Sequence, residues 1–274
     1  MKVIDAHAHI FPDKIVDKAV KSISDFYHST PMQHTGRIQE LINSGDKIGV
    51  VKYLVFSTAT VPHQVESINN FIMEQVKENN KFIGLGTMHI DYESPREELK
   101  RLKINGIHGI KLHPDFQKFS FDDERLYPIY ELLTELNMFV LTHAGDYRYE
   151  FSNPHRIEKV AKDFPRLNII AAHFGGWGEW DKAFECLNLP NVYFDTSSTM
   201  GFDTSNAAKR AFSAYDPSHI FFATDFPMWD HCQELENIKK LGLSNEIFEG
   251  IMYKNFCNFY SCYDKNFTLK ALEN

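Results

Sequence analysis

The sequence predicts an α/β protein that folds as a (β/α)8 barrel (TIM barrel), with a helical insertion after the first strand and an extra helix at the C-terminus. Eight short apolar segments recur along the 274 residues, and a polar or amphipathic segment follows each of them. Several apolar segments are nearly continuous in Ile, Val, Leu and Phe, which is typical of parallel strands buried on both faces. Such barrels usually have about 250 residues, close to the length of this chain.

The expected strands share a run of apolar residues that stops at a polar residue. In chain order they are Lys2–Ala8, Val50–Ser57, Phe82–Met88, Gly106–Leu112, Met138–Thr142, Asn168–Ala172, Asn191–Thr196 and His219–Thr224. No G-x-G-x-x-G motif follows the first strand, which argues against the alternative of an open, doubly wound nucleotide-binding sheet. We see no domain boundary, so we expect a single domain over residues 1–274.

Helices are expected between the strands, where apolar residues recur at helical spacing. Clear examples are Pro62–Val76, Asp122–Leu136, Pro154–Phe164 and Asp203–Tyr215. The segment Phe11–Ile48 is too long for a simple crossover, so we expect it to contain extra short helices and a lid over the first strand. Near the other end of the chain, Ser244–Tyr260 predicts one more helix.

The composition argues against several classes of protein. The chain is 43% hydrophobic and 24% charged, as in a globular domain, and its net charge of −8 comes without a basic cluster that could bind nucleic acid. No apolar stretch approaches the roughly 20 residues that cross a bilayer, so we expect no membrane span. The first residues do not resemble a signal peptide and the four cysteines form no CxxC motif, so we expect reduced thiols and a cytoplasmic location.

Residues that can bind a metal ion stand where five of the expected strands end. These side chains are His7, His9, Lys111, His113, His143, His173 and Asp225. Side chains alternate along a strand, so His7 and His9 point to the same face. The C-terminal strand ends of a barrel converge on one mouth, and burying these groups there is costly unless a cation binds them. A single histidine at such a position could instead form a hydrogen bond to a backbone carbonyl group. Candidate ligands at the same position of five strand ends favour a shared metal site.

The strand-end motifs carry a family resemblance. His7-x-His9, His143, His173 and Asp225 resemble the ligand pattern of the amidohydrolase superfamily. Its amidohydrolase-related branch includes lactone and amide hydrolases and nonoxidative decarboxylases. The segments similar to that branch are GIKLHP (109–114), THAG (142–145), AAHFGG (171–176) and ATDFP (223–227). The resemblance spans nearly the whole chain and is specific for the fold and the metal site, but not for the substrate.

The resemblance implies a first metal site formed by His7, His9, His143 and Asp225. His173 would lie close by, as a ligand of a second metal ion or as a group that polarises the substrate. We expect zinc, which suits nitrogen and oxygen ligands with one open position, with manganese and iron as alternatives. Two-metal relatives carry a carboxylated lysine near the position of Lys111. We expect one metal ion. Whether Lys111 and His173 hold a second metal ion stays an open question. The resemblance also implies a homodimer.

These parts predict a metal-dependent hydrolase that cleaves a C–N or C–O bond (amide, cyclic amide or lactone) of a small molecule. The metal ion would lower the pKa of bound water toward about 7. Asp225 would accept the proton of that water and return it to the leaving group, and His173 would polarise the substrate carbonyl. The residues expected to contact the substrate are Arg37, Arg148, His113, Phe11 and Trp177.

Two alternatives stay open at this point. A metal-dependent nonoxidative decarboxylase of a small unsaturated or aromatic acid would use the same site. It would need a cationic side chain for the acid, for which Arg37 and Arg148 are the candidates. A metal-free binding protein on a barrel scaffold is the weaker alternative, since a fold alone does not determine function. Metal content distinguishes the binding protein from the enzymes, and release of carbon dioxide distinguishes the decarboxylase from the hydrolase.

Overall fold

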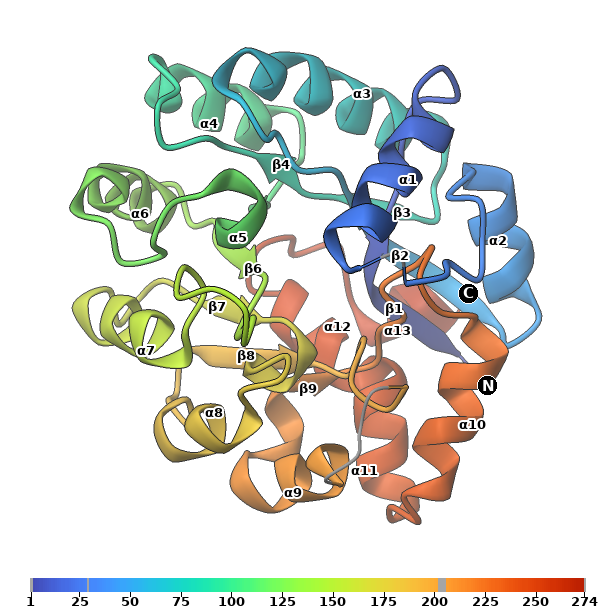
Figure 1. Ribbon diagram of the computed structural model, residues 1–274. Coiled ribbons are helices and arrows are strands. Elements are labelled where there is room, and N and C mark those ends of the chain that lie inside the picture. Colours follow the sequence, from blue (N-terminus) through green and yellow to red (C-terminus); the bar gives the residue numbers. More distant parts are fainter. Residues whose placement is uncertain (1, 29, 202–205, 274) are drawn as a thin grey trace.

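Parallel strands form a ring at the centre of the molecule, and helices surround it (Figure 1). The computed structural model describes residues 2–28, 30–201 and 206–273. One sheet has the strand order β1-β2-β3 and the other has the order β4-β5-β6-β7-β8-β9. The strands are β1 (Val3–His9), β2 (Val50–Phe56), β3 (Phe82–Gly84), β4 (Gly86–Thr87), β5 (Gly109–Leu112), β6 (Phe139–Thr142), β7 (Ile169–Ala171), β8 (Val192–Asp195) and β9 (Ile220–Phe221).

Backbone hydrogen bonds join the two sheets and close the ring. Leu85, between β3 and β4, donates its N–H to the carbonyl oxygen of Val55 at 2.9 Å, so β3 and β4 are two halves of one barrel strand. At the other edge, Ala6 of β1 donates to the carbonyl oxygen of Phe222, directly after β9, at 2.9 Å. Eight parallel strands thus follow one another in sequence order. The predicted (β/α)8 barrel is confirmed, and each expected strand segment overlaps an observed strand.

The outer helices alternate with the strands. They are α3 (Val65–Glu78), α4 (Pro95–Ile104), α5 (Pro114–Gln117), α6 (Tyr127–Glu135), α7 (Pro154–Asp163), α8 (Trp180–Cys186), α9 (Ala207–Ala214) and α10 (His231–Lys240). The four helices named from the sequence correspond to α3, α6, α7 and α9. Short 3-10 turns, Pro62–Gln64 and Glu124–Leu126, precede α3 and α6. Residues 203–205 of the helix expected before Tyr215 lie outside the described residues.

Local sequence explains where several of these helices begin. Proline stands in the first turn of α4, α6 and α7, where its missing N–H has no helical partner to lose. Asn153 caps α7 by accepting a hydrogen bond from the N–H of His155, and Asp230 caps α10 by accepting from the N–H groups of Cys232 and Gln233. Among the described residues, none of the helices has the length and apolar character needed to cross a membrane.

The predicted insertion after the first strand contains α1 (Val16–Phe26) and α2 (Ile38–Asp46). In Figure 1, α1 lies in front of the strand ends, over the barrel. The C-terminal segment is helical, as predicted, in three consecutive pieces. These are α11 (Asn245–Glu249), the π-helical turn η5 (Gly250–Lys254) and α12 (Asn255–Tyr260). A further short helix, α13 (Leu269–Glu273), was not predicted.

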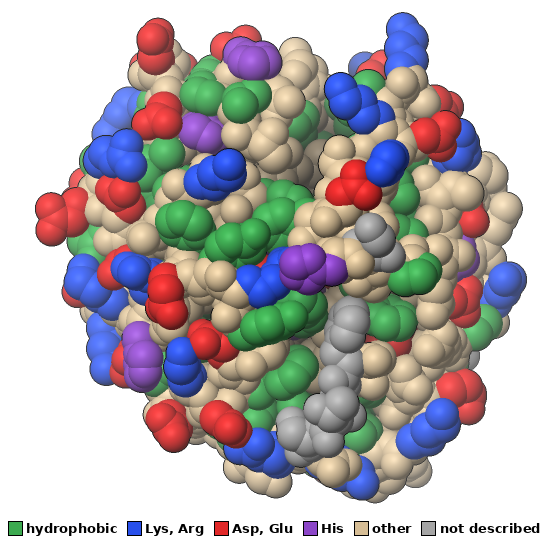
Figure 2. Space-filling view, in the orientation of Figure 1, with side chains coloured by type: hydrophobic (Ala, Val, Ile, Leu, Met, Phe, Trp, Pro, Cys, Tyr) green, Lys and Arg blue, Asp and Glu red, His purple; other side chains and the backbone are tan. Residues whose placement is uncertain are grey.

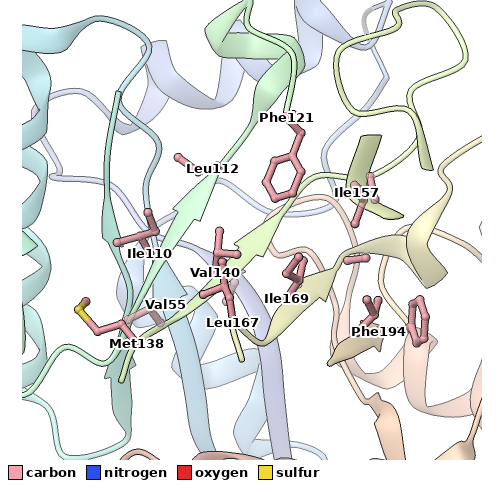
Figure 3. Packing of buried hydrophobic residues seen from close by; sticks show 14 of the residues in the cluster. Val55, Ile110, Leu112, Phe121, Met138, Val140, Ile157, Leu167, Ile169 and Phe194 are labelled. Carbon is pink, nitrogen blue, oxygen red and sulfur yellow. The ribbon is translucent and has the colours of Figure 1, made fainter. Parts of the chain in front are cut away.

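The apolar side chains form two cores because neighbouring residues on a strand point to opposite faces. The outer core lies between the strands and the surrounding helices, and Figure 3 shows part of it, with Val55, Ile110, Leu112, Val140, Ile169 and Phe194. The inner core fills the barrel toward the N-terminal ends of the strands and includes Ile4, Leu54, Leu141, Ile170 and Phe221. Phe256, Phe259 and Tyr260 of α12 belong to the same cluster and cover it.

Strand β1 departs from strict alternation where it reaches the polar end of the barrel. Asp5 lies 3.0 Å (Oδ2) from Nε2 of His231 on the outer helix α10, whereas His7 and His9 line a cavity inside the barrel. The pairing of β1 with β2 shifts in register between Asp5 and Ala8. Bulges of this kind re-aim side chains beside functional sites. Because of this irregularity, His7 and His9 point into the barrel, whereas Asp5 points outward to α10.

Candidate active site

A small polar cavity lies inside the barrel at the C-terminal ends of the strands. All of the predicted strand-end residues line it, namely His7, His9, Lys111, His113, His143, His173 and Asp225. Ile23, Tyr27 and Met32 of the insertion also border it. The cavity measures about 20 Å³, which is room for roughly one water molecule. Hydrophobic side chains gather at the centre of the face shown in Figure 2, with basic side chains and a histidine among them.

The neighbours of His7 determine which of its nitrogens is protonated. Its Nδ1 lies 2.8 Å from Oδ2 of the buried Asp195, an ionised acceptor, so Nδ1 carries the proton. The lone pair of Nε2 then faces Oδ1 of Asp225 at 3.3 Å. Nε2 of His9 lies 3.2 Å from the same oxygen. Two acceptors as close as Nε2 of His7 and Oδ1 of Asp225 require a positive charge between them, so this part of the site fits a metal ion.

Burial and neighbouring charges keep the Asp225 carboxylate charged and the imidazoles of His9 and His173 neutral. Burial opposes the charge of Asp225, but the neighbouring histidines, His7 first, outweigh it and hold the pKa of Asp225 well below its usual range. Burial lowers the pKa of His9 and of His173 to about 4, although Asp225 favours their charged forms. At neutral pH the site therefore offers a carboxylate and unprotonated imidazole nitrogens, which are the forms that bind metal ions.

His173 presents an unprotonated nitrogen toward His143. Its Nδ1 lies 3.2 Å from the backbone carbonyl oxygen of Ser197, which can only accept, so Nδ1 carries the proton. Nε2 of His173 therefore keeps its lone pair and lies 3.1 Å from Nδ1 of His143. Ligand atoms of His7, His173 and Asp225 lie within 4.8 Å of one another. The structure thus groups His173 directly with two of the residues predicted for the first metal.

The backbone is unusual at several positions of the site. His173 and Asp225 adopt φ angles of 60° and 56°, a left-handed region that residues with side chains rarely occupy. Such strain costs about 1–3 kcal/mol per residue and clusters at functional sites. Gly145, two residues after His143, has a φ of 73°, and a Cβ there would lie 2.4 Å from Cα of Gly176. The glycines of the two motifs therefore allow the loops after β6 and β7 to approach closely.

Lys111 places a basic side chain in the same cavity. The residue is buried, and its Nζ lies 5.0 Å from the ring centre of Phe56. Burial lowers the pKa of Lys111 to about 8, against the attraction of Asp195 and Asp225. A lowered pKa increases the share of neutral amine, the form from which a carboxylated lysine is made. The position of Lys111 is thus compatible both with a cation facing a substrate acid and with a second metal site.

Three of the five residues expected at the substrate lie beside the cavity. Nε2 of His113 lies 3.1 Å from the hydroxyl oxygen of Tyr27. Phe11 stacks on His9 with ring centres 6.3 Å apart. Trp177 packs edge-on against Tyr27 with ring centres 5.1 Å apart. Each of these side chains contacts a residue that lines the cavity, and their contact with a substrate stays a prediction.

The two arginines expected at the substrate both form ion pairs with aspartates of the protein. Arg148 donates to both carboxylate oxygens of Asp146, at 2.8 and 2.6 Å, and to the carbonyl oxygen of Phe26. Arg37 forms an ion pair with Asp17 at 3.0 Å, and the structure does not bring it to the cavity. The guanidinium of Arg148 also lies 4.9 Å and 5.3 Å from the ring centres of Tyr27 and Trp177, so a role for Arg148 in binding a substrate acid stays a prediction.

Asp195 and Tyr27 contribute to the site in ways that the sequence did not reveal. Asp195 ends β8 and orients His7, and a carboxylate at the end of an apolar segment was a signal that could have identified it. Tyr27 follows α1 in the insertion. It lines both the cavity and an open groove of about 680 Å³ outside it. Nothing in the periodicity of the insertion places Tyr27 over the histidines.

Solved structures with this fold cover almost the entire chain. An uncharacterised TIM-barrel protein of Bordetella bronchiseptica is 17% identical, with a TM-score of 0.76 over 96% of this chain and 99% of that chain. A dihydroxybenzoic acid decarboxylase of Polaromonas sp. JS666, with bound manganese and the inhibitor 2-nitroresorcinol, is 14% identical, with a TM-score of 0.73 over 100% of this chain and 99% of that chain. At such low identity these similarities establish the fold, a TIM barrel.

Sequence comparisons identify the family. A dihydroorotase of Helicobacter pylori (strain HPAG1) is 22% identical over 215 residues, which is 72% of this chain and 57% of that protein. The match thus spans little more than half of the relative's length. The model of the family described as Amidohydrolase matches residues 4–260 and includes every strand-end motif. The resemblance drawn from those motifs is confirmed, and this chain belongs to the amidohydrolase family.

Proposed function

We propose that this protein is a metal-dependent hydrolase that cleaves a C–N or C–O bond of a small amide, cyclic amide or lactone. One observation carries the proposal. In a buried cavity, the unprotonated Nε2 of His7 and the Nε2 of His9 both lie within 3.3 Å of a single oxygen of the ionised Asp225. A divalent cation would stabilise this arrangement, which desolvation otherwise makes costly.

The chemistry of the donor set supports a divalent cation. The residues proposed to hold it are His7, His9, His143 and Asp225, with His173 and Lys111 placed to take part in a second site. Zinc is our first choice because it suits nitrogen and oxygen ligands with an open position. Manganese should be tested beside it, since the Polaromonas enzyme holds manganese. A bound cation of this kind supplies Lewis acidity and makes a water molecule reactive at neutral pH.

Asp225 is the group placed to move a proton during hydrolysis. Its Oδ2 accepts a hydrogen bond from the hydroxyl of Ser198 at 2.6 Å, while its Oδ1 faces His7 and His9. Because its pKa is low, Asp225 is ionised at neutral pH and can accept the proton of the attacking water. It then returns that proton to the leaving nitrogen or oxygen.

His173 acts through its lone pair. With the proton on Nδ1, its Nε2 cannot donate a hydrogen bond to a substrate carbonyl in the neutral form. Protonation does not supply a donor at neutral pH, because burial lowers the pKa of His173 to about 4. Of the two roles expected for His173, metal ligation is therefore the one that its surroundings favour.

Substrate binding requires the covering side chains to move. The cavity at the histidines measures about 20 Å³, whereas the groove outside it measures about 680 Å³. Tyr27 borders both, and Trp177 lines the groove beside it. We propose that the substrate enters from this groove past Tyr27, so that its reacting bond reaches Asp225 while the rest of the molecule stays between the aromatic rings.

A metal-dependent decarboxylase is the second candidate, and Lys111 is the observation that favours it. The two arginines first considered for a substrate acid form ion pairs with aspartates, whereas the Lys111 side chain lines the cavity itself. A cation there can neutralise a substrate carboxylate beside the metal. The structural similarity to the Polaromonas decarboxylase is compatible with this reaction.

Metal analysis and a substrate panel test the proposal together. Elemental mass spectrometry of the purified protein should find about one zinc or manganese per chain. Chelation should abolish hydrolysis of at least one member of a panel of lactones, amides and cyclic amides that includes dihydroorotate, and metal addition should restore it. Carbon dioxide release from aromatic or unsaturated acids would establish the decarboxylase instead. Absence of metal, with no activity gained on addition, would contradict both enzymes and favour a binding role.

A further inference from the structure

Two buried polar atoms beside the site lack a hydrogen-bond partner among the residues that the structure describes. They are Nε2 of His143 and Oδ1 of Asp115. The other carboxylate oxygen of Asp115, Oδ2, lies 3.9 Å from this Nε2, and the two side chains are only 2% and 0% exposed. Buried polar atoms are nearly always hydrogen-bonded, so such a pair on adjacent side chains calls for an explanation.

The fold holds these two side chains next to each other. Asp115 lies in α5, directly after β5, and His143 directly follows β6, the neighbouring strand. Oδ2 of Asp115 accepts a hydrogen bond from the hydroxyl of Ser152 at 2.6 Å, which fixes the carboxylate. Nδ1 of His143 lies 3.1 Å from Nε2 of His173 on the inner side. The two nitrogens of His143 therefore face in different directions, one toward the proposed ligands and one toward Asp115.

Metal binding would change which nitrogen of His143 is protonated. Nε2 of His173 has a lone pair, so in the absence of a metal the proton of neutral His143 belongs on Nδ1, where it is donated to His173. A cation bound through Nδ1 displaces that proton, and the neutral ring must then carry it on Nε2. Asp115 is the acceptor that faces this atom, and a shift of about 1 Å brings the pair to hydrogen-bond distance.

The geometry points to Asp115 as a positioning residue for His143, accepting a hydrogen bond from Nε2–H and so holding Nδ1 toward the metal. Histidine ligands commonly donate their second N–H to a carboxylate in this way, and loss of the partner weakens metal binding by roughly 10- to 100-fold. Asp195 has the same relation to His7 on the opposite side of the site, at 2.8 Å. The inference rests on the proposed metal-dependent function.

A different explanation is that Asp115 itself binds a second cation. Ligand atoms of Asp115, His143 and Asp146 lie within 4.8 Å of one another. Both oxygens of Asp146, however, already accept hydrogen bonds from Arg148. The guanidinium already supplies a positive charge beside Asp146, so the Asp115 carboxylate is better explained as the partner of His143, whose Nε2 lies 3.9 Å from its Oδ2. The number of bound metal ions in a variant distinguishes the two explanations.

The experiment measures zinc binding to Asp115→Ala, Asp115→Asn and the wild type by competition with a chromogenic chelator, and records visible spectra after cobalt substitution. We expect Asp115→Ala to bind zinc roughly 10- to 100-fold more weakly at unchanged stoichiometry, with an altered cobalt spectrum. Asp115→Asn retains an oxygen that can accept from Nε2–H, so its affinity should lie between the two. Glu234→Gln is the matched control. Glu234 is equally buried and also has an unpartnered oxygen, but it lies on α10 and does not line the cavity.

The outcomes separate this inference from the proposed function. An Asp115→Ala variant with wild-type zinc affinity and an unchanged cobalt spectrum would overturn the inference. So would loss of one metal equivalent with unchanged affinity of the remainder, because Asp115 would then be a ligand itself. If Asp115→Ala does not fold, Asp115→Asn with wild-type affinity and spectrum overturns it equally. Failure of the proposed function appears differently, as a wild-type protein that binds no metal.

Discussion

The inside of the barrel has two layers of side chains from the same strands, an apolar layer and a polar layer, which are stabilised by different interactions. Toward the N-terminal ends, inward side chains such as Leu141 and Phe221 pack against Phe256 and Phe259 of α12. Toward the C-terminal ends, the inward side chains are histidines, a lysine and carboxylates. The burial of an apolar side chain is favourable without a directional contact. Each buried polar atom, in contrast, needs a hydrogen-bond donor, an acceptor or an opposite charge as its partner.

Residues that stabilise the fold and residues that take part in the reaction thus lie at different levels along the barrel axis. A side chain removed from the apolar layer leaves a cavity and weakens folding. A charge removed from the polar layer relieves desolvation but also removes favourable interactions with its neighbours, so the two effects on stability oppose each other, and the reaction loses a group that it needs. Substitutions in the apolar layer should therefore change the free energy of unfolding, and substitutions in the polar layer should change metal binding and activity.

The largest effect is expected for Asp225→Asn in the polar layer. The amide cannot accept a proton from water, so activity should fall by roughly 10²- to 10⁴-fold, as for loss of a general base. The urea midpoint of unfolding should change less than the activity, because burying one charge fewer offsets part of the lost interaction with His7 and His9. His7→Ala should lose activity to a similar extent in a folded protein. Wild-type turnover in either variant would mean that the site is elsewhere.

The counterpart in the apolar layer is Phe256→Ala. The Phe256 ring is buried and lies 5.5 Å from the ring of Phe221, centre to centre. Truncation should lower the free energy of unfolding by about 3–5 kcal/mol, measured by urea denaturation. Zinc affinity and activity of the folded fraction should not change. A large loss of metal affinity at unchanged stability would show that the two layers are coupled rather than separable.

Acid should destabilise the polar layer of the metal-free protein. Burial lowers the pKa values of His9 and His173 to about 4 in the folded protein, against about 6.5 in an unfolded chain. Between these values the unfolded chain binds protons that the folded chain does not, so stability falls as the pH falls. The expected loss between pH 7 and pH 5 is about 2 kcal/mol per histidine. Urea denaturation of chelator-treated protein measures it, and a stability that does not fall over this range would contradict the buried, neutral state of the two rings.

The smallest effect is expected for Tyr27→Phe at the edge of the cavity. The variant keeps the ring but removes the hydroxyl, which lies 3.1 Å from Nε2 of His113. We expect a change in KM of less than about tenfold, in keeping with one lost hydrogen bond, and a smaller change in kcat. Arg37→Ala serves as the surface control and should leave both constants unchanged. A strong rise in KM for the control would place Arg37 at the substrate after all.

Sequence patterns predicted the strands and the strand-end groups better than they predicted the surroundings of those groups. His143, His173 and Asp225 were located because each directly follows a segment of apolar residues, and a barrel brings such positions together. Arg148 was expected at the substrate for its position after His143, yet Asp146 and Phe26 use its donors. A local pattern shows where a side chain begins along the chain, but not which distant partner its charged end will meet.

The sequence by itself determined the alternation of strands and helices, the family and the set of groups at the barrel mouth, because all of these depend on local periodicity and residue type. Only the tertiary structure decided that an irregularity in β1 turns His7 inward while Asp5 points outward, and that Asp195 orients His7. It also placed Tyr27 over the histidines and Asp115 beside His143. These arrangements join residues far apart in the chain, and their hydrogen bonds depend on shifts of an ångström or less, which no local pattern specifies.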